Sequence, residues 1–264
     1  MNLAPIELER FLTSSTKVPT EDLDWAEARR AGLTPDERTI LTYFSDIEGQ
    51  TIIYTRELLN TKASEDPEIM AFLTMWNYEE FFHGRVLSRI LEETGTALGS
   101  DRVVQVRRKS LWSENFLAFL STLFSKLAPD CFITLYMTWG AINELTTLRG
   151  YEAIHSMTGN PILQTLCDRI AKQERRHFAW YFNRARERLE KSSRTQKAVR
   201  LLLEKAWSPV GAGVKSDEEV RRLLDLVFPG PRVSEMAEDV DRQISTLPGL
   251  QGIGLMQRYL AAPA

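Results

Sequence analysis

The sequence predicts an all-α protein built around four long helices. Apolar residues recur every three or four positions through four long segments, capping residues and prolines precede these segments, and no strand-like alternation stands out. Each such segment buries one apolar stripe, so four of them can pack as a bundle with a shared core. The 264 residues are enough for one large helical domain.

An N-terminal arm, residues 1–33, precedes the first core helix. That helix is expected to begin after Thr34, because Thr34 can cap it, Pro35 suits its first turn, and a glutamate follows at the capping-box position. Its apolar stripe continues at helical spacing to Leu58 and includes Glu48, which is therefore expected to face inward.

The second core helix is expected to begin at Asp66-Pro67 and to end near Gly95. Its inward stripe alternates steps of three and four residues, as in a bundle helix, and this stripe includes Glu80 and His83. The two side chains form a Glu-x-x-His pair, which a helix places on one face.

A long connection, residues 100–128, separates the second helix from the third. It is basic through Arg102–Lys109, and the apolar segment Phe116–Leu127 predicts a helix of its own. A crossover at this point is expected when four helices pair as two hairpins.

The third and fourth helices repeat the pattern of the first two. The third begins at Pro129 and carries Glu144 on its stripe; the fourth begins at Pro161 and carries Glu174 and His177. Each half of residues 34–190 is therefore a helix with one inward glutamate followed by a helix with Glu-x-x-His.

Residues 191–264 are more polar and predict extra, shorter amphipathic helices separated by proline–glycine turns. We expect this C-terminal extension to pack on the bundle or on a partner subunit.

The inward glutamates and histidines predict a metal site. Several buried carboxylates without partners would cost more free energy than one domain's stability can absorb, whereas two divalent cations balance four carboxylates. Carboxylate and imidazole ligands suit iron or manganese, and zinc would favour thiolates. The predicted ligands, which we call the carboxylate–histidine cluster, are Glu48, Glu80, His83, Glu144, Glu174 and His177.

Three segments resemble the acyl-carrier-protein desaturases, the di-iron branch of the ferritin-like superfamily. Glu79–Gly84 resembles the family's Glu-Glu-x-x-His-Gly motif, Asn143–Thr147 resembles its Gln-Glu-x-x-Thr motif, and Cys167–His177 resembles its fourth-helix segment. The resemblance covers about residues 25–190 and implies a ferritin-like four-helix bundle.

The resemblance also implies roles and a reaction. Glu48 and Glu144 would be terminal ligands, Glu80 and Glu174 would bridge two irons, each iron would take one histidine, and Thr147 would assist O2 activation. The implied activity is O2-dependent oxidation of an acyl chain, with desaturation as the leading reaction. The acyl group would be attached to an acyl-carrier protein or held in another thioester, and an external donor such as ferredoxin would supply electrons.

Further residues are expected around the metals. Gln173 occupies the position where the family usually has an aspartate that orients a ligating histidine; an amide can hydrogen-bond there but holds no charge. Cys167 is a second candidate for contact with the ligands. Candidate walls of a substrate pocket are Trp76, Met137, Gly140 and Tyr181.

Composition narrows the class of protein. The net charge of −3 argues against a nucleic-acid-binding surface, and two cysteines make neither a disulfide framework nor a rubredoxin site. No apolar run of transmembrane length appears, and Met1–Arg10 lacks an export signal, so a cytoplasmic location is expected. We also expect a homodimer. The basic segment Arg102–Lys109 is interpreted either as a solvated face, which is the usual role of a run of charges, or as a candidate dock for an acidic carrier protein.

Alternatives stay open. A mixed manganese–iron pair, a di-iron oxygenase for another small substrate, a ferritin-like iron-binding or peroxide-scavenging protein, and a structural bundle without metal all fit parts of the pattern. The ligands alone do not separate desaturation from hydroxylation.

Overall fold

The computed structural model describes residues 8–49, 51–59, 61–99, 123–212 and 215–262, and within these ranges the chain is all-helical, without a named strand. The α-helices are α1 (Leu8–Ser14), α2 (Trp25–Ala31), α3 (Pro35–Glu48), α4 (Thr51–Leu59), α5 (Pro67–Glu93), α8 (Pro129–Met157), α9 (Pro161–Glu190), α10 (Ser193–Ala206), α11 (Asp217–Val227), α12 (Arg232–Ile244) and α13 (Leu255–Ala261). This confirms the predicted all-α class.

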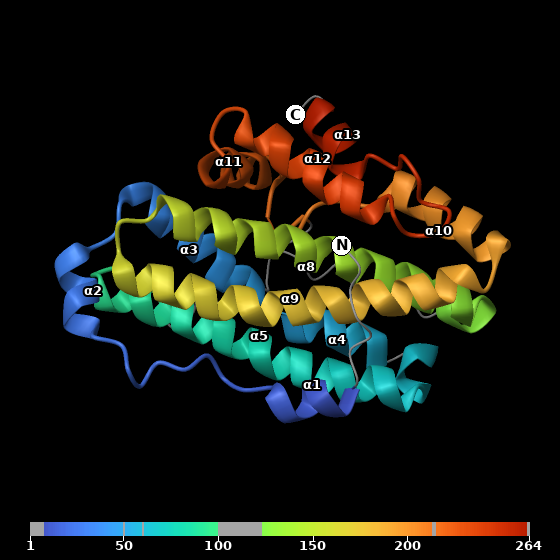
Figure 1. Cartoon of the computed structure of the whole chain (residues 1–264), viewed down its shortest axis with the longest axis horizontal. Coiled ribbons are helices and arrows are strands. Elements are labelled where there is room, and N and C mark those ends of the chain that lie inside the picture. The colour runs from blue at the N-terminus through green and yellow to red at the C-terminus, as the bar shows by residue number, and fades with distance from the viewer. Residues whose placement is uncertain (1–7, 50, 60, 100–122, 213–214, 263–264) are drawn as a thin grey trace.

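Helices α3, α5, α8 and α9 form the centre of the molecule. The longest of them, α5, α8 and α9, run lengthwise side by side (Figure 1). Along their lengths α8 packs on α9 and α3 packs on α5, and α5 also contacts α9. The two predicted hairpins therefore lie against each other.

The predicted helix starts are present. Thr34 and Glu37 form a reciprocal capping box at the start of α3. The side chains of Asp66 and Asn160 accept backbone N–H bonds at the starts of α5 and α9, and each is followed by proline. These caps satisfy amides that a helix leaves unpaired at its first turn.

The first predicted helix is interrupted where one continuous helix to Leu58 was expected. Helix α3 ends at Glu48, Gly49 follows it, and α4 begins at Thr51. Gly49 is a poor helix residue, and it lies where α3 comes closest to Gly84 of α5. The break leaves Glu48 at the last position of α3.

The N-terminal arm is part of the packed structure. Phe11 of α1 is buried, with its ring 5.2 Å from that of Phe72 on α5. Helix α2 contacts both α5 and α9. The arm therefore covers the α5 and α9 side of the bundle.

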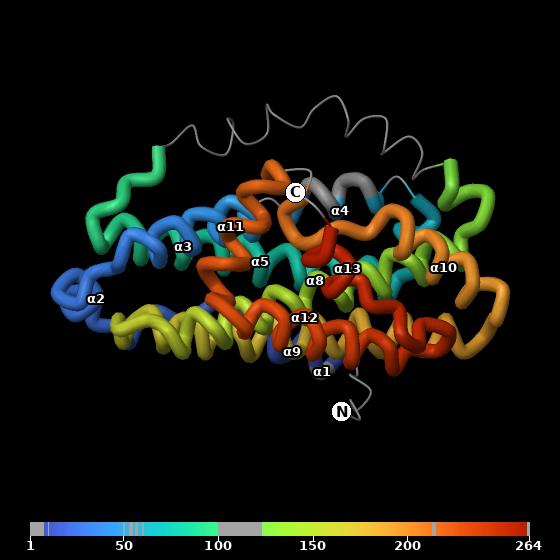
Figure 2. Tube along the Cα trace, turned by 90° about the horizontal axis from the view of Figure 1, so that it is seen from above, coloured from blue at the N-terminus to red at the C-terminus, as the bar shows by residue number. Residues whose placement is uncertain are grey.

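The C-terminal helices cover another face. Helices α10 and α12 pack on α8, and α11 packs on α3. Viewed from above, they lie over the bundle (Figure 2). Of the two expected locations for this extension, the structure shows packing on the bundle.

Part of the predicted crossover lies outside the described residues. These are residues 100–122, which include the candidate dock Arg102–Lys109; residues 123–127, directly before α8, are helical. No helix among the described residues combines the length and apolar character needed to cross a bilayer.

Candidate metal centre

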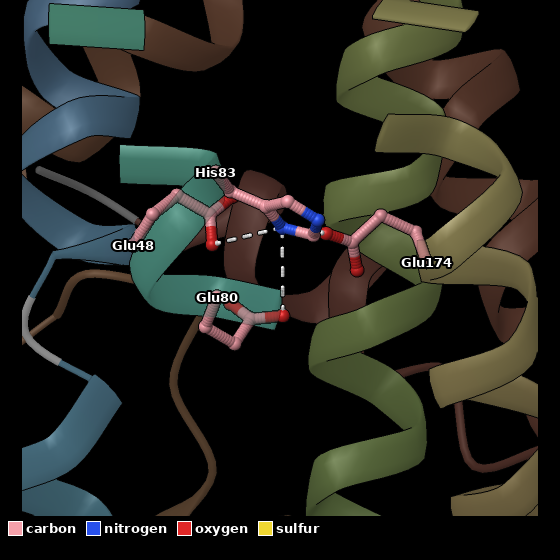
Figure 3. A group of neighbouring side chains, drawn as sticks. All are labelled: Glu48, Glu80, His83 and Glu174. Carbon is pink, nitrogen blue, oxygen red and sulfur yellow. Dashed lines mark ion pairs between the residues drawn. The ribbon is translucent and has the colours of Figure 1, made fainter. Parts of the chain in front are cut away.

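The structure brings all six residues of the carboxylate–histidine cluster together. They form two overlapping groups, and within each group one potential ligand atom per residue lies within 4.8 Å of the others. The first group is Glu48, Glu80, His83 and Glu174, whose side chains point toward one another in Figure 3. The second is Glu80, Glu144, Glu174 and His177.

The four central helices each contribute to the cluster. Glu48 is the last residue of α3, and Glu144 lies in the middle of α8. The Glu-x-x-His pairs of α5 and α9 supply the rest, because residues three apart share a helix face. All six residues are buried, and none is more than 6% exposed.

The Nδ1 atom of His83 faces the first group. It lies 3.1 Å from Glu174 Oε1, 3.7 Å from Glu80 Oε1 and 4.0 Å from Glu48 Oε2. The other ring nitrogen, His83 Nε2, points away from this group and lies 2.7 Å from Gln173 Oε1.

The Nδ1 atom of His177 faces the second group in the same manner. It lies 3.1 Å from Glu80 Oε1, 3.4 Å from Glu144 Oε2 and 3.5 Å from Glu174 Oε2. Glu80 and Glu174 are thus shared by both groups, and Glu174 presents one oxygen to each histidine. Glu48 and Glu144 each belong to a single group.

Several of these buried atoms have no hydrogen-bond partner among the residues that the structure describes. They are Glu80 Oε1, both carboxylate oxygens of Glu174, His83 Nδ1 and His177 Nδ1. Unpaired polar atoms in a protein interior are costly and rare, and here five of them face one another. Cations coordinated at this point would satisfy all five, so the residues present fit a metal site.

Burial and crowding perturb the pKa values of the cluster. Desolvation, followed by repulsion from other cluster carboxylates, raises the pKa of Glu80 and of Glu144 well above the usual range. Burial also opposes ionisation of Glu174, but the neighbouring imidazoles of His177 and His83 outweigh it and lower the pKa of Glu174. Without cations the cluster therefore retains protons, because four neighbouring carboxylates cannot all ionise in a dry interior.

A buried network holds the outer nitrogen of each histidine. His177 Nε2 lies 2.7 Å from Glu79 Oε2, and His83 Nε2 lies 2.7 Å from Gln173 Oε1. Glu79 is fully buried and also accepts a bond from Arg176 at 2.6 Å. The contact predicted for Gln173 is present. Arg176 is half-buried and forms an ion pair with Glu79.

Two aromatic side chains hold the unshared glutamates. The Tyr151 hydroxyl donates to Glu48 Oε1 at 2.7 Å, and the Trp76 indole donates to Glu144 Oε1 at 3.0 Å. The role of Tyr151 was not predicted. Its place on the apolar stripe of α8, two turns after Glu144, was the available signal.

The predicted pocket residues are packed side chains. Met137 and Tyr181 are buried, and the Tyr181 ring lies 6.0 Å from that of Trp76. A Cβ at Gly140 would lie 2.6 Å from the Tyr181 ring, so that ring fills the space beside Gly140. The substrate pocket stays a prediction.

Two other predicted residues lie outside these contacts. Thr147 is half-buried on α8, one turn after Glu144. Cys167 is fully buried on α9, seven residues before Glu174, which is about 10 Å along a helix. Cys167 belongs to neither group of potential ligands, and burial raises the pKa of its thiol.

The fold and the site define an all-helical protein whose interior holds a carboxylate–histidine cluster able to bind metal ions. Comparison with protein-family models, with curated proteins and with solved structures finds no match to this chain. The assignment of function therefore depends on the chemistry of the site.

Proposed function

We propose that this chain is a ferritin-like di-iron oxidoreductase that uses O2 to oxidise an acyl chain. The leading reaction is desaturation of a fatty acyl group carried on an acyl-carrier protein or another thioester. One observation carries the proposal: five unpaired ligand atoms face one another within a buried set of four glutamates and two histidines.

The proposed ligand roles follow from which groups share each side chain. Glu80 and Glu174 would bridge the two ions, because both belong to both groups. Glu48 would bind only the ion at His83, and Glu144 only the ion at His177. When bound, an iron pair would pass electrons from the external donor to O2, so that O2 could act as the oxidant of an unactivated C–H bond.

The protein's own side chains would orient and isolate the metals. Tyr151 and Trp76 hold one oxygen of Glu48 and Glu144, which leaves the other oxygen of each free to bind. Glu79 and Gln173 keep the proton of each histidine on Nε2, so that Nδ1 presents its lone pair to the cluster. Burial of the whole set excludes water from the reacting centre.

Iron is the expected metal because the donors are oxygen-rich with one imidazole per ion. A manganese–iron pair has the same donor preference and stays within the proposal. The charge of two divalent ions matches four ionised carboxylates, which removes the electrostatic cost of the metal-free cluster.

The test combines metal analysis with product analysis. Protein made in iron-supplemented medium is reduced with ferredoxin and supplied with O2 and an acyl-carrier-protein thioester. We expect about two irons per chain and loss of two hydrogens from the acyl group, by mass spectrometry. Glu174→Gln should abolish both, whereas Glu92→Gln, the same change at an exposed site on α5, should alter neither.

Other outcomes point to the alternatives. Iron accumulation far above two per chain, without acyl oxidation, would indicate iron storage. Gain of one oxygen on the acyl chain would indicate hydroxylation. Less than about 0.2 metal per chain would leave a structural bundle, because a complete site of this kind should bind metal tightly.

A further inference from the structure

The side-chain amide of Gln173 has one orientation that its neighbours permit. Its Nε2 lies 2.6 Å from the carbonyl oxygen of Thr16 and 3.1 Å from Glu79 Oε1, and both are acceptors. Reversing the amide would place its oxygen against these two oxygens. Gln173 Oε1 therefore accepts from His83 Nε2, and Nδ1 is the ring nitrogen of His83 that faces the cluster.

The corresponding partner of His177 is a carboxylate. Glu79 Oε2 accepts from His177 Nε2 at 2.7 Å, while Glu79 Oε1 accepts from Arg176 and from the backbone amide of Thr16. Arg176 Nη2 lies 2.6 Å from Glu79 Oε1 and forms an ion pair with this buried carboxylate. His177 Nε2 therefore donates a hydrogen bond to a charged carboxylate, whereas His83 Nε2 donates to a neutral amide oxygen.

Each of the two groups of potential ligands defines one metal position, which we name after its histidine, His83 or His177. The difference between the histidine partners matters because the direct ligands of these two metal positions are of the same kinds. Each position takes one unshared glutamate, one histidine and the same two shared glutamates. A carboxylate that accepts the outer N–H of a ligating imidazole makes the imidazole a stronger donor than a neutral amide does. The partners of the two histidines therefore differ in charge, although the direct ligands of the two metal positions are of the same kinds.

We propose that the two metal positions are inequivalent: the position at His177 binds its ion first and more tightly, and the position at His83 binds second and exchanges more readily. Glu79 and Gln173 are the positioning residues that set this order. The inference rests on the proposed metal centre and extends it to the order of loading.

The test is an anaerobic titration of the metal-free full-length chain with Mn²⁺, in which calorimetry and electron paramagnetic resonance monitor the binding. We expect two binding steps whose affinities differ by about 10- to 100-fold. The first equivalent should produce the signal of an isolated Mn²⁺ ion, and the second should convert it to that of a coupled pair.

Three variants and one control assign the two binding steps to the two metal positions. Glu79→Gln should weaken the first step by about 10-fold or more. Gln173→Leu should weaken the second step more than the first, because Gln173 Nε2 also donates to Glu79. Glu92→Gln repeats the charge change of Glu79→Gln at an exposed site on the same helix and should leave both steps unchanged. His83→Ala should remove the second step and retain the first.

The inference is overturned if both ions bind to the wild type with one affinity, or if His83→Ala removes the first step. Both results leave the metal centre itself in place. If the wild type binds no Mn²⁺ at all, the inference and the proposed function are both overturned. Circular dichroism on each variant separates loss of metal binding from loss of fold.

Discussion

Replacing Gly84 by alanine should test how closely α3 and α5 must approach to complete the cluster. A Cβ at Gly84 would lie 2.9 Å from the backbone nitrogen of Gly49 and 3.1 Å from its Cα. Both obstacles are backbone atoms, so the end of α3 must move away from α5. Glu48 directly precedes Gly49, and the same movement would carry its carboxylate away from the other ligands.

The magnitude follows from opposing terms. Overpacking a well-packed interior costs about 1–3 kcal/mol. Alanine in a helix interior recovers about 1 kcal/mol relative to glycine. For the metal-free protein we therefore expect a net loss of about 0–2 kcal/mol. If displacement of Glu48 weakens metal affinity about 10-fold, the metal-loaded protein loses a further 1.4 kcal/mol or so.

The assay is urea unfolding of the wild type and Gly84→Ala, with and without metal, together with metal content per chain. Gly159→Ala is the matched control, because no atom of the described part of the chain lies within 4 Å of a Cβ built at Gly159. We expect the control to keep wild-type metal content and stability. If Gly84→Ala retained the full wild-type stabilisation by metal, the reasoning from this close approach would be refuted.

Three further predictions concern stability. Burial raises the pKa of Glu80 and of Glu144 above their unfolded value of 4.5, so the folded metal-free protein holds protons that the unfolded chain releases. The free energy of unfolding of the metal-free protein should fall as pH rises above 4.5, by about 1.4 kcal/mol per pH unit for each proton retained. Bound metal should make this dependence of stability on pH weaker, and thermal melts at several pH values measure both. Tyr151→Phe removes the donor to Glu48 and should cost the metal-free protein about 1.5–3 kcal/mol in urea unfolding. Asn160→Ala removes the cap of α9 and two bonds to backbone carbonyls, and should cost about 2–4 kcal/mol by the same measurement.

Each of these has a contrary result. Metal-free stability that rises between pH 5 and 8 would contradict the raised carboxyl pKa values. A Tyr151→Phe variant as stable as the wild type would show that Glu48 finds another donor. An unchanged unfolding midpoint for Asn160→Ala would mean that the contact between α2 and the start of α9 contributes little.

The features that the sequence alone determined are local ones. Caps, prolines and the three-and-four spacing of apolar residues depend on neighbours within one or two helical turns, so they identified the central helices and their starts. The same periodicity placed Glu80 with His83, and Glu174 with His177, on inward faces. The repeat of this pattern in both halves named all six residues that the structure brings together.

Other features depend on how one helix is rotated and advanced against another, and only the tertiary structure decided them. Glu79 appears exposed when α5 is considered by itself, yet it is buried because α9 places His177 and Arg176 across from it. The hydroxyl of Tyr151 meets Glu48 only because α8 and α3 cross at that level. Contacts between residues about a hundred positions apart leave no periodic trace in the chain. The partners that orient the ligands were therefore settled by packing, whereas the ligands themselves followed from helical spacing.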